Sequence, residues 1–186
     1  MARAKVLVPL AEGFEEIEAV TVIDILRRAG VEVISAGLTD GPIKGSRGIV
    51  VTPDTAVHRI MDNDFDMVVL PGGLPGTTHL RLDKRIHDIV NRIHERKGYV
   101  TAICAAPTLF AEMGFLEDRR ATSHPSTREE VSARTKDYSE DRVVTDGHFI
   151  TSRSPGTAME FAMKLVEVLA GKEMVAKVNE GVMAKV

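Results

Sequence analysis

The stretch Met67-Val68-Val69-Leu70-Pro71-Gly72-Gly73 decides the fold class, because four consecutive apolar residues stop abruptly at Pro-Gly-Gly. A short run that is apolar throughout is typical of a strand buried on both faces of a parallel sheet. Residues 82–96 follow with a charged, amphipathic helical pattern, and residues 99–103 form the next apolar run. Strand, helix and strand in this order predict a parallel βαβ unit.

The same alternation extends in both directions along the chain. Further strands are expected at 6–10, 31–36 and 49–51, and further helices at 15–28, 105–113, 157–169 and 173–182. Residues 143–151 alternate around Asp146-Gly147, which predicts an antiparallel hairpin. The fold class is therefore α/β, a flavodoxin-like three-layer sandwich with a mostly parallel sheet and one antiparallel hairpin, built as a single domain over residues 1–186.

Composition limits the ligand to a small molecule. The 186 residues carry a net charge of −3, only 4% aromatic residues and no Trp, so neither a nucleic-acid nor an anionic-membrane surface is indicated. One cysteine forms no intramolecular disulfide and no multi-thiolate zinc site. The first residues lack a signal-peptide pattern, and no stretch approaches the roughly 20 apolar residues of a membrane span. We expect a cytoplasmic protein without a cofactor.

Three loops are candidates for the functional site: residues 11–15, 71–76 and 104–107. Each directly follows an apolar run, and ligands of parallel sheets bind beyond the carboxyl ends of the strands. The glycine-rich loop 72–76 lacks the spacing of a nucleotide site. Two interpretations stay open for it, a tight turn that requires glycine, and a close backbone approach that offers the Gly73 amide to an anion.

Cys104 lies at the turn between a predicted strand and a predicted helix. The same geometry exposes the nucleophile of the α/β hydrolases, and a helix N-terminus favours the reactive thiolate. A lone cysteine is also a common buried, inert residue. Its place at the end of a strand favours the functional interpretation.

Four glutamates open the first helix: Glu12, Glu15, Glu16 and Glu18. Acidic residues are ordinary in a first helical turn, so most are expected to be solvated. Glu18 lies one turn beyond Glu15, between apolar residues. If it turns toward the sheet, burial would keep its carboxyl protonated and able to donate or shuttle a proton.

Of the six histidines, His124 is the one expected to face the crevice, because it follows a possible strand and precedes Pro125. No pair has the spacing of metal ligands, so we predict no metal site. The others are expected at the surface: His58, His79, His87, His94 and His148.

Four stretches together resemble the ThiJ/PfpI superfamily, in the branch of the parkinsonism-associated protein deglycase and the YajL-type bacterial proteins. They are residues 11–18 (AEGFEEIE), 69–73 (VLPGG), 102–107 (AICAAP) and 151–157 (TSRSPGT). The resemblance implies that Cys104 is the reactive cysteine and Glu18 its partner carboxyl. It also implies an oxyanion pocket formed by the backbone at Gly72, Gly73 and Ala105.

The resemblance further implies a homodimer whose site lies close to the subunit interface. Arg47 and Asp24 match positions near that contact and the site entrance, and His124 matches a histidine found near the cysteine in some members. Related proteases carry a histidine directly after the cysteine, where this chain has Ala105. This departure disfavours a cysteine peptidase or amidase.

These residues lead to one preferred function and one rival. The preferred function is a cofactor-independent, cysteine-dependent glyoxalase or deglycase, acting on methylglyoxal, glyoxal or their early adducts with proteins and releasing a 2-hydroxy acid. The rival is a non-enzymatic redox sensor or stress chaperone, in which Glu18 would stabilise an oxidised Cys104. Both need the same pair of side chains, so the sequence leaves them open.

Overall fold

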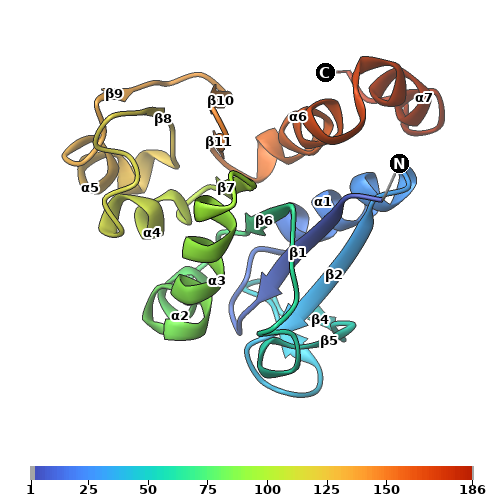
Figure 1. The fold of residues 1–186 in the computed structure, drawn as a ribbon, viewed down its shortest axis with the longest axis horizontal. Coiled ribbons are helices and arrows are strands. Elements are labelled where there is room, and N and C mark those ends of the chain that lie inside the picture. Colours follow the sequence, from blue (N-terminus) through green and yellow to red (C-terminus); the bar gives the residue numbers. More distant parts are fainter. Residues whose placement is uncertain (1–2, 186) are drawn as a thin grey trace.

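A seven-stranded sheet forms the centre of this computed structural model, which describes residues 3–185 (Figure 1). Residues 1, 2 and 186 of the expected domain lie outside the described part of the chain. The strand order is β10-β11-β7-β6-β1-β2-β5. The strands span β1 Lys5–Leu10, β2 Glu32–Gly37, β5 Thr55–Ala56, β6 Met67–Leu70, β7 Tyr99–Ile103, β10 Val143–Asp146 and β11 Phe149–Ser152.

Neighbouring strands in this sheet run parallel except for β10 and β11, which form the expected antiparallel hairpin. Two short ribbons lie outside the sheet. In one, β3 (Ile43–Lys44) pairs antiparallel with β4 (Val50–Val51), and in the other β8 (Arg120–Ala121) pairs parallel with β9 (Asp137–Tyr138). The strand expected at 49–51 is present as β4, but it pairs in this ribbon with β3, which is only two residues long and was not expected.

Helices cover both faces of the sheet, which confirms the three-layer sandwich (Figure 1). Successive side chains of a strand point to opposite faces. Accordingly, Val6 and Val8 pack under one layer and Leu7 under the other. The first layer holds α1 (Glu16–Arg28), α6 (Ala158–Ala170) and α7 (Lys172–Val182); the second holds α2 (Gly76–Leu82), α3 (Lys84–Glu95), α4 (Pro107–Glu112) and α5 (Arg128–Ser132).

The helix expected over residues 82–96 is present as α3, but it begins at Lys84, and a separate helix that was not expected, α2, ends just before Asp83. The Asp83 backbone is extended, and its carboxylate caps α3 by accepting a hydrogen bond from the Arg85 amide at 2.9 Å. An aspartate at this position satisfies a free amide of the first turn. The cap therefore starts a new helix where the apolar pattern alone continues.

The expectation that His94 and His148 lie free at the surface is also wrong. Both are half-buried, with His94 Nδ1 2.9 Å from His148 Nε2, and they pack against Phe115 and Phe149. Burial lowers the pKa of each ring. The pair joins the end of α3 to the β10–β11 turn, at the end of β7 remote from Cys104.

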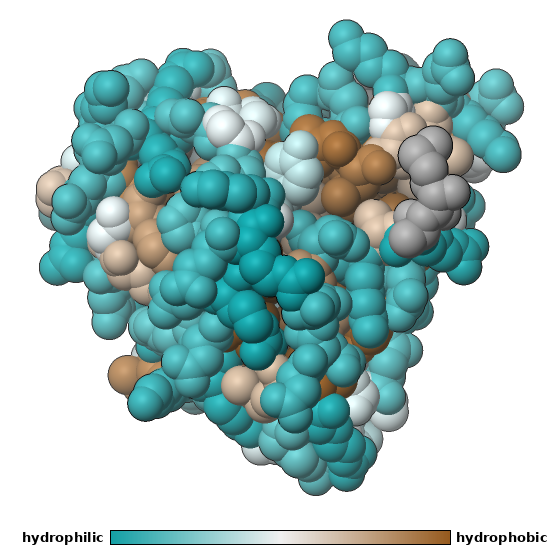
Figure 2. All heavy atoms as spheres, in the orientation of Figure 1, coloured by the Kyte–Doolittle hydropathy of each residue, from teal (hydrophilic) through white to brown (hydrophobic). Residues whose placement is uncertain are grey.

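The outer surface is mostly hydrophilic in the view of Figure 2, with hydrophobic atoms gathered beside α6. Within residues 3–185, none of the helices combines the length and the apolar character that crossing a membrane requires.

Candidate active site

The three loops expected to carry the site do converge beyond the carboxyl ends of β1, β6 and β7. The Glu15 amide donates to Gly72 O at 2.9 Å, which ties the first loop to the second. Gly73 has a φ of +91°, and a Cβ there would lie 2.4 Å from the Glu15 nitrogen. Both interpretations that the sequence left open for this loop therefore apply to Gly73, which adopts a left-handed turn and also allows two backbones to approach closely.

Cys104 occupies a strained turn between β7 and α4. Its φ of +66° is unusual for a residue with a side chain and costs on the order of 1–3 kcal/mol. Two backbone hydrogen bonds hold it there: its amide donates to Ser152 O at 2.9 Å, and its carbonyl accepts from the His124 amide at 2.8 Å. The turn is therefore fixed by β11 on one side and by the His124 segment on the other.

Glu18 is fully buried in the first turn of α1, directly against this thiol. Its Oε2 accepts a hydrogen bond from the Gly72 amide at 2.8 Å. Its Oε1 makes no hydrogen bond within the described residues. The Cys104 side chain lies close enough to the carboxyl to lower its pKa. A Cβ on Gly72 would lie 2.6 Å from Cys104 Cβ and 2.7 Å from Glu18 Oε2, so only glycine fits beside the pair.

Burial raises the pKa of Glu18 to about 7. Burial and the neighbouring Glu18 carboxylate raise the pKa of the Cys104 thiol, while the amides of Ala105 and Gly73 lower it. Burial and Glu18 therefore outweigh the helix N-terminus that was expected to favour the thiolate. Above about pH 7 the pair as a whole keeps one proton, which sits on sulfur or on oxygen. The nucleophilic form is the one in which Glu18 holds that proton.

A pocket of about 340 Å³ opens over the thiol, within the size range of small-molecule sites. The Gly73 and Ala105 amides point toward Cys104, as expected for an oxyanion pocket. The Gly72 amide is not available for that role, because it donates to Glu18. The pocket is lined by Glu15, Ser46, Arg47, Gly73, Leu74, Cys104, Ala105, His124, Ser126 and Pro155.

His124 lines this pocket, but its ring makes no hydrogen bond to the thiol among residues 3–185. Its Nδ1 accepts from the Ser126 amide at 3.1 Å. In the neutral ring this bond puts the proton on Nε2, which leaves Nε2–H as the donor for a ligand.

Glu15 and Glu16 are buried rather than solvated, contrary to the expectation for a first helical turn. Glu15 caps α1 by accepting from the Glu18 amide at 2.8 Å, and burial raises its pKa. Glu16 accepts from the Arg47 amide at 2.7 Å and from the Ser46 hydroxyl at 3.1 Å. Its carboxylate therefore shapes the turn that carries Arg47 to the pocket rim.

Glu16 should make stability depend on pH. Burial by itself raises its pKa, but hydrogen bonds, the largest from the Arg47 amide, outweigh burial and lower the pKa below the ordinary 4.5. A lowered folded-state pKa stabilises the fold above about pH 4.5, and this contribution is lost as pH falls through the folded value. We expect Glu16→Gln to cost roughly 1–2 kcal/mol at neutral pH, from the hydrogen bonds lost.

Urea unfolding at several pH values measures this effect. The difference between wild type and Glu16→Gln should shrink below about pH 4.5. Glu32→Gln serves as a control, because its side chain is half exposed and pairs with Lys5 at 3.6 Å on the surface. A difference that stays constant with pH would contradict the assignment to Glu16.

Two further expectations concern residues outside the pocket. Asp24 lies on the exposed side of α1, paired with Arg28 at 2.6 Å, and does not line the pocket. Within residues 3–185 no cluster of three or more His, Cys, Asp or Glu side chains could hold a metal ion.

The sequence did not point to three of the pocket residues, Ser46, Ser126 and Pro155, whereas Glu15 and Leu74 lie in loops that were expected to carry the site. One signal was available for the glutamates: Glu16 and Glu18, two residues apart, point to different sides of the helix, so they cannot both face solvent when one side packs on a sheet. Ser46 and Ser126 reach the site through tertiary contacts, for which no local pattern exists.

The family model described as the DJ-1/PfpI family matches residues 4–168. Protein dj-1beta of Drosophila melanogaster is 42% identical over 178 residues, which are 95% of each chain. The Parkinson disease protein 7 homolog of Danio rerio is 39% identical across all of both chains. The protein of Caenorhabditis elegans named glutathione-independent glyoxalase DJR-1.2 is 36% identical, covering 91% of this chain and 90% of its own.

Solved structures agree with these sequence relationships. The crystal structure of Drosophila melanogaster DJ-1beta superposes with a TM-score of 0.94 at 40% identity, covering all of both chains. The structure titled "Toxoplasma gondii DJ-1, oxidized" has a TM-score of 0.94 at 34% identity, covering 98% of this chain and 100% of that one. The fold, the order of the motifs and these matches show that this chain belongs to the DJ-1/PfpI family.

Proposed function

We propose that this protein is a cofactor-independent glyoxalase or deglycase that acts on methylglyoxal, glyoxal or their early adducts with proteins. The observation that carries the proposal is the buried Glu18 carboxyl held against the Cys104 thiol beneath a small pocket. A relative named as a glutathione-independent glyoxalase supports it. A nucleophile and a proton-transferring group in contact are what an aldehyde rearrangement needs.

In the first step the Cys104 thiolate attacks the aldehyde carbon, and a carbon–sulfur bond forms. The electron pair of the carbonyl moves to its oxygen, which takes the proton from Glu18 and gives a hemithioacetal. While charge develops on this oxygen, the Gly73 and Ala105 amides are placed to stabilise it. On a hemiaminal adduct with a protein amine, the thiolate forms a bond to the carbon that carries the hydroxyl, the carbon–nitrogen bond breaks, and Glu18 protonates the departing amine, which gives the same hemithioacetal.

In the second step the Glu18 carboxylate removes the hydrogen from the carbon bound to sulfur and returns a proton to the neighbouring carbonyl carbon, while the hydroxyl proton passes from the first oxygen to the second. The hemithioacetal becomes an isomeric thioester of a 2-hydroxy acid, so no oxidant is needed. Water then cleaves the thioester, releasing the acid and restoring the thiol. His124 and Arg47 line the pocket. We assign to His124 Nε2–H and to the Arg47 side chain the binding of the substrate oxygens and of the water.

Methylglyoxal consumption without added glutathione tests the proposal. The expected result is one equivalent of lactate for each equivalent of aldehyde lost, continuing over many turnovers. Aldehyde loss that stops at one equivalent of enzyme, with a stable adduct on Cys104, would mean simple trapping and would contradict catalysis.

A second candidate, a cysteine redox sensor, is favoured by Glu18 Oε1, which makes no hydrogen bond in the part of the chain that the structure describes, and by the oxidised structure of the Toxoplasma gondii relative. Two equivalents of peroxide would convert the thiol to a sulfinic acid and release two waters, and protonated Glu18 would donate to the sulfinate. Mass spectrometry after mild peroxide treatment tests it. A stable two-oxygen adduct confined to Cys104 supports sensing, whereas an unmodified Cys104 contradicts it.

We further propose that the protein works in the cytoplasm as a homodimer. Ile17 and Val20 on α1, with Ile49 and Val50 on the adjacent ribbon, are about half exposed (46–58%). Ile49 follows closely after Arg47, which lines the pocket, and a second copy would shield these apolar side chains from water. Light scattering coupled to gel filtration should give twice the chain mass of 20.3 kDa.

A further inference from the structure

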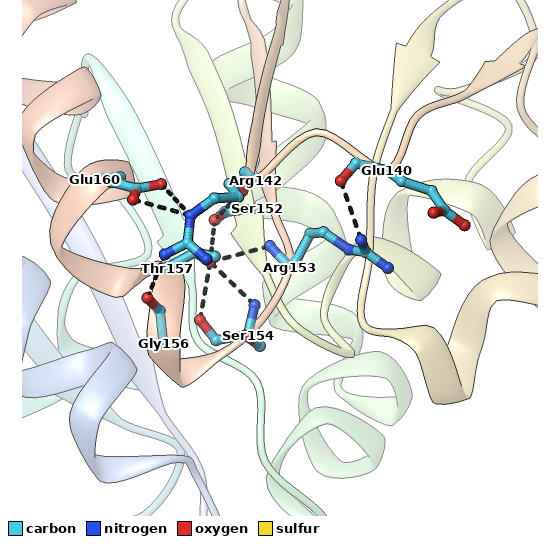
Figure 3. Close-up of polar contacts among 8 residues, drawn as sticks. All are labelled: Glu140, Arg142, Ser152, Arg153, Ser154, Gly156, Thr157 and Glu160. Carbon is cyan, nitrogen blue, oxygen red and sulfur yellow. Dashed lines mark hydrogen bonds and ion pairs between the residues drawn. The ribbon is translucent and has the colours of Figure 1, made fainter. Parts of the chain in front are cut away.

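The loop at residues 153–157, between β11 and α6, carries a dense polar network that the reaction above does not use (Figure 3). Pro155 on this loop lines the pocket beside Cys104. Ser152 directly precedes the loop, and its carbonyl oxygen accepts a hydrogen bond from the Cys104 amide at 2.9 Å. The chain therefore contacts the proposed site at two points: Pro155 of the loop forms part of the pocket wall, and Ser152 just before the loop holds the cysteine turn.

The side chain of Thr157 is at the centre of this network (Figure 3). Its hydroxyl oxygen accepts from the Ser154 amide at 3.1 Å and from the Arg153 amide at 3.3 Å. It lies 2.7 Å from the Ser152 hydroxyl and 2.9 Å from Ser154 O. Thr157 and Ser152 are almost fully buried, so water cannot replace these bonds when one is lost.

Arg142 holds the same loop from its exposed side. Its guanidinium donates to both carboxylate oxygens of Glu160, at 2.9 and 2.7 Å, and to Gly156 O at 2.7 Å. The Ser152 hydroxyl in turn donates to Arg142 O at 2.8 Å. The loop is thus connected to β10 and to α6 as well as to the cysteine turn.

We propose that Thr157 is a positioning residue for Cys104, acting through Ser152 and the 153–157 loop. Its hydroxyl fixes the loop, the loop fixes Ser152, and Ser152 O keeps the cysteine amide in the left-handed turn. The position of the thiol relative to Glu18 and to the Gly73 and Ala105 amides depends on this chain of contacts. An effect of Thr157 on turnover rests on the proposed function. Its effect on the reactivity of the Cys104 thiol can be measured even if the protein does not catalyse that reaction.

The test compares Thr157→Val with Thr157→Ser, measuring the rate of Cys104 alkylation by iodoacetamide as a function of pH. Valine removes the hydroxyl at nearly constant volume, whereas serine keeps it. We expect Thr157→Val to slow alkylation about tenfold at neutral pH and to move the midpoint of the pH profile, an effect of the size of one lost hydrogen bond. Thr157→Ser should restore the wild-type profile.

Thr101→Val is the matched control, because its equally buried hydroxyl donates to Val68 O at 2.9 Å within the sheet. It should lower thermal stability without moving the alkylation midpoint. If Thr157→Val does not fold, Arg142→Gln loosens the same loop from the surface and should move the midpoint in the same direction.

A wild-type alkylation profile in Thr157→Val, or in Arg142→Gln if that variant must replace it, would overturn the proposal. Because alkylation needs no turnover, this outcome differs from failure of the glyoxalase reaction, in which wild-type protein alkylates normally and produces no lactate. If turnover does occur, Thr157→Val should also raise KM, since Pro155 forms part of the pocket wall.

Discussion

Replacing Cys104 by serine should abolish methylglyoxal turnover, with a loss in kcat/KM of at least about a thousandfold, as is found when an enzyme loses its nucleophile. The physical reason is specific to this site. A serine hydroxyl is far less acidic than a thiol, and the single proton held near neutral pH would stay on the hydroxyl. Initial rates of lactate formation at substrate concentrations well below KM give the value directly.

The fold is expected to survive this change, because serine is slightly smaller and the backbone of residue 104 is held by Ser152 and His124. Circular dichroism and thermal unfolding check this. Ser126→Ala is a useful companion, because it removes a hydroxyl that lines the same pocket but keeps the thiol, and it should retain most activity. Turnover that persists in Cys104→Ser would exclude the covalent mechanism.

The second large effect is expected from Glu18→Gln, which removes the proton-transferring group while keeping its shape. We expect a loss in turnover of about a hundredfold or more, the usual range for a general acid or base. The pH profile should change as well. In wild type the rate of Cys104 alkylation should rise through about pH 7, where the pair loses its first proton, and then level off.

In Glu18→Gln no carboxyl remains to share a proton with sulfur. The alkylation rate should then continue to rise toward the ordinary thiol range near pH 9 and beyond, because burial still raises the pKa of Cys104. Glu12→Gln is the matched control: Glu12 is exposed on the loop before α1, and its profile should match wild type. An unchanged midpoint in Glu18→Gln would show that the two groups do not share a proton.

Linkage gives the same pair an effect on stability, with a sign opposite to that of Glu16. A folded-state pKa raised to about 7 means that Glu18 favours the fold below its unfolded value of 4.5, and that this contribution is lost as pH rises through about 7. The site is therefore built at a cost to stability at neutral pH, as expected for a carboxyl placed for chemistry rather than for structure.

The sequence by itself determined the layered fold and the place of the site. Short runs such as Met67–Leu70 are apolar throughout, and this is a local property that requires burial on both faces. Because the carboxyl ends of parallel strands lie at one edge, the loops after β1, β6 and β7 had to meet there. Cys104, at the end of β7, was found for the same reason.

Only the tertiary structure decided which groups in that site are hydrogen-bonded to one another. The Gly72 amide bonds to Glu18 across 54 residues, and Glu16 binds the Arg47 amide across 31, so no local pattern predicts either contact. Whether a carboxyl is solvated or buried depends on what packs over it, and burial sets its pKa. For this reason the sequence placed Cys104 and Glu18 at one crevice but not the proton that they share.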